Sequence, residues 1–378
     1  MTGSSTQSNA RAVRSAFERV DSLTVGVEEE LMLLDPETLD LAPRAGELIE
    51  RTDGDPRFKL ELPAAQIEIL SPPLGSVAEA AEFLAAARRD LAAAAEGLVR
   101  LGGAGVHGFA AVEGEVNPGE RYRRTLEAYG RVARRQLVFA FQVHVAVPGP
   151  ERALAVYNAM RSYLPELLAL SANAPFYAGE DTGLATVRPK IAELLPRQGV
   201  PPAIESWERF AAELAWGERA GGVPEPRVWW WELRPHPIHG TIEVRVPDTQ
   251  ATVRDAAAVA AVAHSLAAWL AARHDAGELP PPASTWRIEE NRWAALRGGV
   301  HGELADLETG ERTPTRQRLD GLLDRLGPTA AAIGCADQLA AARELAAANG
   351  ADRQRERARD CGPRAAVADL ADRFLEGA

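Results

Sequence analysis

The sequence predicts an α+β fold, in which a curved, mainly antiparallel β-sheet has helices on one face and an open polar face on the other. Extended segments follow one another after short connections, which is typical of antiparallel neighbours. Several of them alternate apolar residues with charged or amide residues, as strands with one buried face do. No fixed-period repeat and no clear linker occurs in the 378 residues. We therefore expect one domain over 21–378, after a flexible lead-in at 1–20.

The first half of the domain begins with extended segments. They cover 23–34, 58–62 and 65–70, and the last of them stops before two prolines. Ser76 and Glu79 form a capping-box pattern, which opens an Ala-rich helix that we expect to reach about Leu101. The stretch 103–110 is a candidate for a further short strand.

The middle of the chain alternates between helical and extended patterns. We expect a basic helix at 119–134, a strand within 136–148 and a helix over 150–172. The stretch 171–189 is rich in turn-forming residues and reads as a long loop, a kind of segment that is often functional. Another helix fits 203–217.

The last extended segments are 227–235 and 240–248, and their close spacing predicts a hairpin. From about 253 the chain is Ala-rich and predominantly helical. The antiparallel order of the strands and the helical C-terminal part together give the predicted α+β architecture.

Charge and composition exclude several classes of protein. The formal net charge of −12 argues against a nucleic-acid partner, because phosphate binding favours a basic surface. The polar N-terminal stretch has no apolar segment of a signal peptide, and we found no other apolar run of transmembrane length, so no membrane association is expected. Cys335 and Cys361 match neither a disulfide framework nor a metal spacing, which favours a cytoplasmic location. The sequence leaves open whether the chain forms a homo-oligomer.

The stretch TVGVEEELMLLD (24–35) contains three consecutive glutamates inside an otherwise apolar strand. Because side chains on a strand alternate between faces, Glu28 and Glu30 share one face and Glu29 takes the other. Glu29 then lies on the apolar side, where we expect an ion pair with a helix.

The same alternation gives four other segments one apolar and one polar face. The polar sets are Gln66 with Glu68; Gln142 with His144; Trp230 with Glu232 and Arg234; and Thr241 with Glu243 and Arg245. A solvated face is the simple explanation for any single strand. The five segments together carry Glu, Gln, His and Arg but no Lys, which favours a functional face.

Clustered carboxylates repel one another and need cations nearby when they are buried. Oxygen ligands with one imidazole suit Mg²⁺ or Mn²⁺. Arginines on the same face indicate an anion, and a nucleotide phosphate held by both the metal and the guanidinium groups satisfies the pattern. The chain has neither a P-loop nor a strand-linked GxGxxG.

Six ordered segments resemble the carboxylate–amine ligase family, the bacterial type 2 glutamate–cysteine ligases. They are TVGVEEELMLLD, QIEILSPP, FQVHVAVP, LLALSANAPFYAGEDTGLATVRP, WWWELRPHPIHGTIEVRVPD and ENRWAALRGGV, and they span roughly 22–300. The resemblance implies a fold similar to glutamine synthetase and the guanidino kinases. It also implies that ATP drives the joining of the γ-carboxylate of L-glutamate to the amine of L-cysteine through an acyl phosphate.

The resemblance assigns roles by motif. Arg245 would neutralise the transferred phosphoryl group and Arg234 would be a second anion contact. Arg188, Gln142 and Trp230 would bind substrate or nucleotide. The metal ligands would be Glu28, Glu30, Glu68, His144 and Glu243, with Glu61 as a weaker candidate.

Several residues have structural explanations beside the functional ones. For Arg188, a position on the surface explains the sequence as well as substrate binding does. Asn173 is expected to orient the 171–189 loop. His236 and His239, in the hairpin turn, favour a structural role. Trp229 and Trp231 are expected in the core.

Two departures from the family pattern concern the substrates. Gln142-Val143-His144 replaces an HVH segment, and Gly105-Val106-His107-Gly108 stands where GTHP is expected. The alternatives are therefore a different carboxylate or amine, a noncatalytic nucleotide or amino-acid sensor, and metal-dependent hydrolysis.

Overall fold

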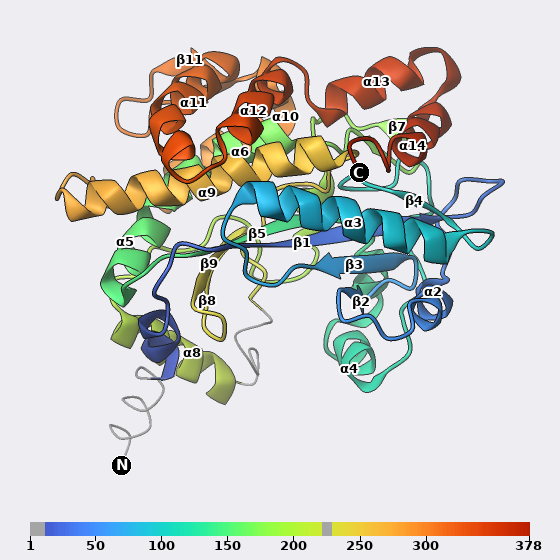
Figure 1. Ribbon diagram of the computed structural model, residues 1–378, viewed down its shortest axis with the longest axis horizontal. Coiled ribbons are helices and arrows are strands. Elements are labelled where there is room, and N and C mark those ends of the chain that lie inside the picture. Colours follow the sequence, from blue (N-terminus) through green and yellow to red (C-terminus); the bar gives the residue numbers. More distant parts are fainter. Residues whose placement is uncertain (1–11, 221–228) are drawn as a thin grey trace.

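The computed structural model describes residues 12–220 and 229–378, and an open β-sheet forms its centre (Figure 1). Within the described residues this sheet has seven strands, and all of its pairings are antiparallel. The strands are β1 (Val25–Leu34), β2 (Phe58–Leu60), β3 (Gln66–Leu70), β4 (Arg100–Gly102), β5 (Phe141–Ala146), β8 (Leu233–His236) and β9 (Thr241–Val244). Their order is β2-β3-β1-β5-β9-β8, with β4 paired to β1. The predicted α+β fold is confirmed.

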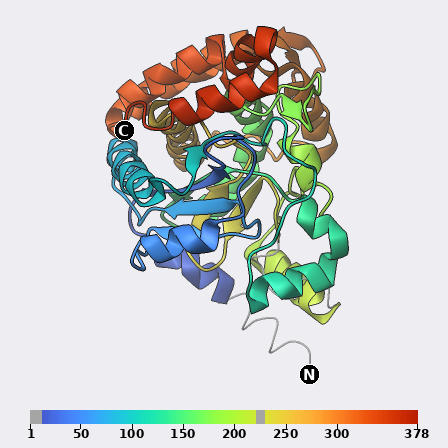
Figure 2. The same cartoon turned by 90° about the vertical axis from the view of Figure 1, so that its right-hand side faces the viewer.

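Helices form the layers around the sheet. They are α2 (Ala45–Arg51), α3 (Val77–Ala95), α4 (Glu120–Tyr129), α5 (Pro150–Met160), α6 (Leu164–Ser171), α7 (Arg188–Ala192), α8 (Trp207–Arg219), α9 (Val253–Asp275), α10 (Thr285–Gly298), α11 (Thr315–Ala332), α12 (Ala336–Ala347), α13 (Gly350–Cys361) and α14 (Pro363–Asp372). In Figure 1, α3 and α9 lie along one side of the sheet, and the orange and red C-terminal helices lie beyond them. Figure 2 shows the same C-terminal helices as an outer cap.

Two small hairpins lie outside the main sheet. One pairs β6 (Phe176–Tyr177) with β7 (Glu180–Asp181), and the other pairs β10 (Glu303–Ala305) with β11 (Arg312–Pro314). The first belongs to the predicted 171–189 loop, which is therefore partly structured.

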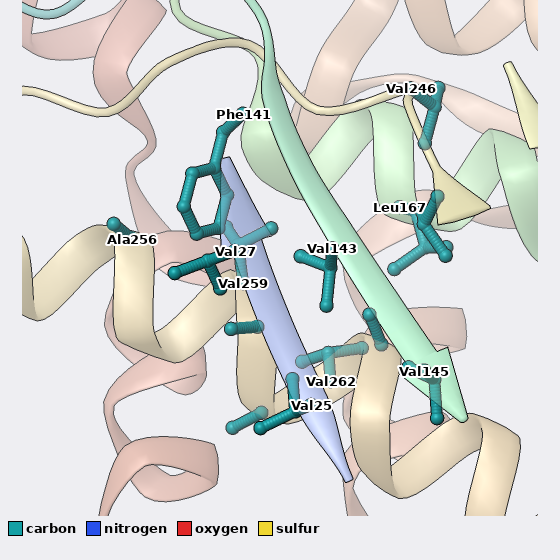
Figure 3. Packing of buried hydrophobic residues seen from close by; sticks show 14 of the residues in the cluster. Val25, Val27, Phe141, Val143, Val145, Leu167, Val246, Ala256, Val259 and Val262 are labelled. Atoms are coloured by element: carbon teal, nitrogen blue, oxygen red, sulfur yellow. The ribbon is translucent and has the colours of Figure 1, made fainter. Parts of the chain in front are cut away.

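The apolar face of the sheet packs against α9. Val25 and Val27 of β1 and Val143 of β5 are completely or almost completely buried and point toward Val259 and Val262 of α9 (Figure 3). Burying a side chain of this size contributes roughly 1.5–3 kcal/mol. This packing commits the opposite side chains of β1 and β5 to the polar face.

Helix α9 is the central helix of the fold. The hydroxyl of Thr252 accepts a hydrogen bond from the amide of Asp255 and caps its N-terminus. The helix has 23 residues and contains an 18-residue window with a mean hydropathy of 1.4, so it is long and apolar enough to cross a membrane, which corrects our expectation that no such run exists. Because 83% of that window is buried inside the fold, α9 is explained as a core helix.

The structure corrects several predicted boundaries. Residues 12–18 form a helix, and Phe17 is fully buried with its ring 4.5 Å from that of Trp207, so this part of the lead-in packs against the domain. Residues 1–11 lie outside the described residues. The helix expected to reach Leu101 ends at Ala95. The strand expected at 103–110 is not formed, and the strand in this part of the chain is β4, which ends at Gly102. Both hairpin strands are shorter than predicted, and Arg227 and Val228 lie outside the described residues.

Candidate active site

Strand register brings the predicted polar residues onto one face. Directly opposite residues in an antiparallel pair point to the same side. Glu30 lies opposite Glu68, and Glu28 lies opposite Gln142. In turn, His144 and Arg234 both lie opposite Glu243, on the two sides of β9.

Glu28, His144 and Glu243 form a compact group. One potential ligand atom from each lies within 4.8 Å of the other two. His144 Nε2 is 3.2 Å from a carboxylate oxygen of Glu28 and 3.9 Å from one of Glu243. Nε2 is also buried without a well-aligned hydrogen bond among the described residues, so it remains available to a ligand.

Thr241 orients the imidazole of His144. Its hydroxyl oxygen lies 2.8 Å from Nδ1. When Nδ1 carries the proton and donates a hydrogen bond to the hydroxyl oxygen of Thr241, Nε2 presents a lone pair toward Glu28 and Glu243. Such a partner on the second ring nitrogen is the usual companion of a metal-ligating histidine.

Two arginines converge on Glu243. The Arg234 guanidinium donates to both of its carboxylate oxygens, and Arg245 donates to one of them. Burial by itself would raise the pKa of Glu243, but Arg245, Arg234 and His144 hold that pKa well below its usual range. Glu243 therefore stays ionised, and the two guanidinium groups lie next to the metal-type group.

Gln142 links Arg245 to Glu30. Its amide nitrogen donates to a Glu30 oxygen at 3.1 Å, while its amide oxygen accepts from Arg245. An amide can donate and accept at once. Gln142, which stands where the family pattern has an imidazole, therefore bridges a carboxylate and an arginine.

Glu30, Glu61 and Glu68 form a second acidic group. Burial and then repulsion by Glu61 raise the pKa of Glu30 to about 7. Burial, together with Glu61, Glu28 and Glu30, raises the pKa of Glu68 well above its usual value. The pKa of Glu61 is also raised, mainly by burial. Such mutual repulsion is relieved when a cation lies between the carboxylates.

The comparisons with known proteins agree on one family. A family model described as glutamate–cysteine ligase family 2 matches residues 24–367. A protein of Rubrobacter xylanophilus, named as a candidate glutamate–cysteine ligase 2-3, is 42% identical over 339 residues, which are 88% of this chain and 91% of that protein. A second protein from the same organism, named as a candidate glutamate–cysteine ligase 2-1, is 36% identical over 88% of this chain and 89% of its own length.

The chain belongs to glutamate–cysteine ligase family 2. Its membership makes it an ATP-dependent ligase. A crystal structure of a glutamate–cysteine ligase from Francisella tularensis in complex with AMP has a TM-score of 0.68 to it, at 11% identity, covering 95% of this chain and 89% of that one. At that identity the likeness concerns the fold.

Arg188 makes a structural ion pair in this family 2 ligase. Its Nε is 2.6 Å from a carboxylate oxygen of Asp248, and its NH2 group donates to the main-chain oxygens of Arg245 and Val246. Asp248 also accepts from the amide of Asn173. Arg188 and Asn173 thus hold the 171–189 loop against the segment that follows β9. Substrate binding by Arg188 remains a prediction.

Trp229 and Trp231 belong to the core, as predicted. Trp229 is buried and its ring lies 4.8 Å from that of Trp231, which packs against the core. Trp230 is half-buried and contacts the ring of Tyr129, with the Arg197 guanidinium 5.7 Å from its own ring. Its nucleotide role remains a prediction.

His236 and His239 stack with ring centroids 4.4 Å apart, and each lies edge-on to His144. The ring of His236 accepts the amide of His239 and so shapes the hairpin turn. Burial lowers the pKa of His236 to about 3. These contacts support the predicted structural role.

Glu232 does not belong to the polar set in which the sequence placed it. It precedes β8, so the strand alternation does not extend to it, and it accepts from the buried Arg292 of α10 at 2.7–2.9 Å. Its main-chain oxygen accepts the amide of Arg245 at 2.8 Å. Sequence reasoning identified the ENRWAALRGGV segment without a role for Arg292, whose partner is 60 residues away.

Proposed function

We propose that the protein is a glutamate–cysteine ligase that uses ATP and Mg²⁺, with Mn²⁺ as a substitute. The observation that carries this proposal is the pairing of a metal-type group, Glu28, His144 and Glu243, with two arginines on the same carboxylate. A metal–phosphate complex requires both kinds of group side by side.

The proposed reaction has two transfers. The γ-carboxylate of glutamate attacks the γ-phosphorus of ATP, which releases ADP and forms γ-glutamyl phosphate. The amine of cysteine then attacks the acyl carbon, loses its proton and displaces inorganic phosphate. Arg245 and Arg234 would neutralise charge on the transferred phosphoryl group, and most of the acceleration would come from positioning and electrostatics.

The carboxylates and His144 fit the cations that this reaction uses. Glu28, Glu30, Glu68, His144 and Glu243 would hold them, and Glu61 would support the second acidic group. Bound divalent ions would neutralise the phosphate oxygens of ATP. The raised pKa values of Glu30 and Glu68 support this assignment, because burial and repulsion disfavour their ionised forms when no cation is near.

The remaining assignments belong to the same proposal. Gln142 would hold Arg245 toward the phosphates, while Trp230 and Arg188 would contact nucleotide and substrate. The expected location is the cytoplasm, and the expected partners are small molecules.

Incubation with ATP, Mg²⁺, L-glutamate and a panel of amines tests the proposal, with ADP and product mass both measured. We expect ADP and a γ-glutamylcysteine mass only with cysteine. ADP with a different amine would retain the chemistry and overturn the substrate, turnover without ATP would indicate hydrolysis, and nucleotide binding without any turnover would indicate a sensor.

A pair of variants tests the site itself. We expect Glu30→Gln to lower kcat by orders of magnitude, because it removes one negative charge that would hold the cation. Glu37→Gln, at an exposed position before α2, is the matched control and should retain full activity. Unchanged activity in Glu30→Gln would remove Glu30 from the mechanism.

A further inference from the structure

A groove lies apart from the polar face of the sheet, between the start of α6, the Pro280–Pro282 segment and α11. Its volume is about 680 Å³. Tyr163 and Glu166 line one wall, while Arg318 and Arg325 line another. A space of this size accommodates an amino acid or a short peptide.

Glu166 lies at this groove with one carboxylate oxygen unsatisfied. Its side chain is only 5% exposed. Oε1 accepts two hydrogen bonds from Arg318, at 3.0 and 2.6 Å. Oε2 is buried and has no hydrogen-bond partner among the described residues. A buried acceptor without a donor is costly, so a donor brought by a ligand would be favourable there.

The groove also presents cations. Arg325 is exposed on α11 and makes no hydrogen bond or ion pair within residues 12–220 and 229–378. The guanidinium of Arg287 donates to the main-chain oxygens of Leu307 and Glu308. The lining holds three acidic residues (Glu166, Asp306, Glu308) and three basic ones (Arg287, Arg318, Arg325). It therefore offers both signs of charge without a net excess, which suits a ligand that carries both.

We propose that this groove binds the zwitterionic head group of a free α-amino acid or short peptide. The ammonium group would donate to Oε2 of Glu166, and the carboxylate would accept from Arg325. A bidentate guanidinium–carboxylate contact and an ammonium on a buried carboxylate are both strong, charge-assisted interactions. This site is separate from the strand face and does not depend on which substrates the ligase uses.

Equilibrium dialysis of the full chain tests the proposal, with labelled L-glutamate, L-cysteine and γ-glutamylcysteine as separate probes and neither ATP nor Mg²⁺ present. The groove component is the part of the binding that is lost in Arg325→Ala. We expect at least about tenfold weaker binding of one probe in that variant, equivalent to the loss of one charge-assisted contact. Comparison of the three probes separates a free amino acid from a peptide.

Arg359→Ala is the matched control, because Arg359 is exposed on α13 and does not line the groove. It should bind like the parent. Glu166→Gln should also weaken the same component, and an N-acetylated or amidated form of the bound probe should not compete for it. The proposal would be overturned if Arg325→Ala left the binding of all three probes unchanged at probe concentrations up to about 10 mM, which is beyond the range of a weak millimolar complex. Equal competition by the N-acetylated form would overturn it as well.

Discussion

Glu29 and Arg88 form a bidentate ion pair in which neither side chain is accessible to solvent. Nε and NH2 of Arg88 donate to the two carboxylate oxygens of Glu29 at 2.9 and 2.6 Å. The guanidinium also donates to the main-chain oxygens of Gln250, Ala251 and Phe374, so it joins α3 to β1, to the segment before α9 and to the C-terminus. The predicted ion pair between Glu29 and a helix is confirmed.

Glu29→Gln should therefore destabilise the fold. The change leaves the buried Arg88 charge without its counter-charge, and breaking such a pair costs about 3–5 kcal/mol. We expect this loss in the free energy of unfolding from urea titration, with near-normal kcat for the protein that remains folded. Glu28→Gln is the comparison, because the partly exposed Glu28 should cost little stability and most of the activity. Equal urea midpoints for Glu29→Gln and the parent would contradict the structural role.

Thr241→Val should raise the Mg²⁺ concentration that half-maximal activity requires. Valine keeps the shape of the side chain and removes the oxygen that lies 2.8 Å from Nδ1 of His144. Loss of such a partner typically costs 10–100-fold in metal affinity or activity. The measurement is the Mg²⁺ concentration that gives half-maximal turnover at saturating ATP. Thr309→Val, in an exposed turn, should leave it unchanged; an unchanged value in Thr241→Val would show that Thr241 does not orient the imidazole.

Arg292→Lys should lower kcat/KM by about 100-fold, because a shift of about 1 Å at a distant support can have that effect. Arg292 holds Glu232, whose main-chain oxygen fixes the amide of Arg245. Lysine cannot reproduce the bidentate contact. Because Arg292 acts through Arg245, the loss should appear in kcat more than in the KM for glutamate. Arg297→Lys, exposed on the same helix, is the control; matching kinetics in both variants would contradict this positioning role.

Acid should destabilise the protein partly through His264, which is buried in α9. Burial lowers its pKa in the folded state to about 4, from an ordinary value of 6.5. Its contribution is therefore present above pH 6.5 and is lost as the pH falls toward 4, since the unfolded chain takes up the proton first. At pH 5 the loss is about 2 kcal/mol.

Urea titrations of the parent and His264→Leu between pH 7.5 and pH 5 measure this contribution, with the pH range chosen around the ordinary histidine pKa of about 6.5. We expect the variant to lose less stability on acidification than the parent. His301→Gln, at an exposed histidine, should follow the parent. Parallel curves for the parent and His264→Leu would mean that His264 takes up its proton equally readily in the folded state.

The polar face was predictable because its signal is local. Alternation along a strand assigns Glu28 and Glu30 to one face and Glu29 to the other. Burial of Val25 and Val27 against α9 maintains that alternation in the fold. Where the strand stops, the inference fails. Glu232 precedes β8, so it turns to Arg292 although its spacing from Arg234 suggested a shared face.

Composition misled the prediction at the N-terminus. The polar first 20 residues suggested a flexible lead-in, yet Phe17 completes the apolar cluster beside Trp207. The helix buries the apolar side chains of Val13, Ala16 and Phe17 together, and this buried area holds it against the domain.

By itself, the sequence determined the α+β class, the polar face of the sheet and the acidic and imidazole residues that it carries. Only the tertiary structure decided which cation each carboxylate meets: Arg88 for Glu29, Arg292 for Glu232, Arg234 and Arg245 for Glu243, and Arg188 for Asp248. Strand alternation depends on neighbouring residues, whereas Arg88 and Arg292 reach partners 59 and 60 residues away. Packing of the helices on the sheet sets those distances, and no local pattern encodes them.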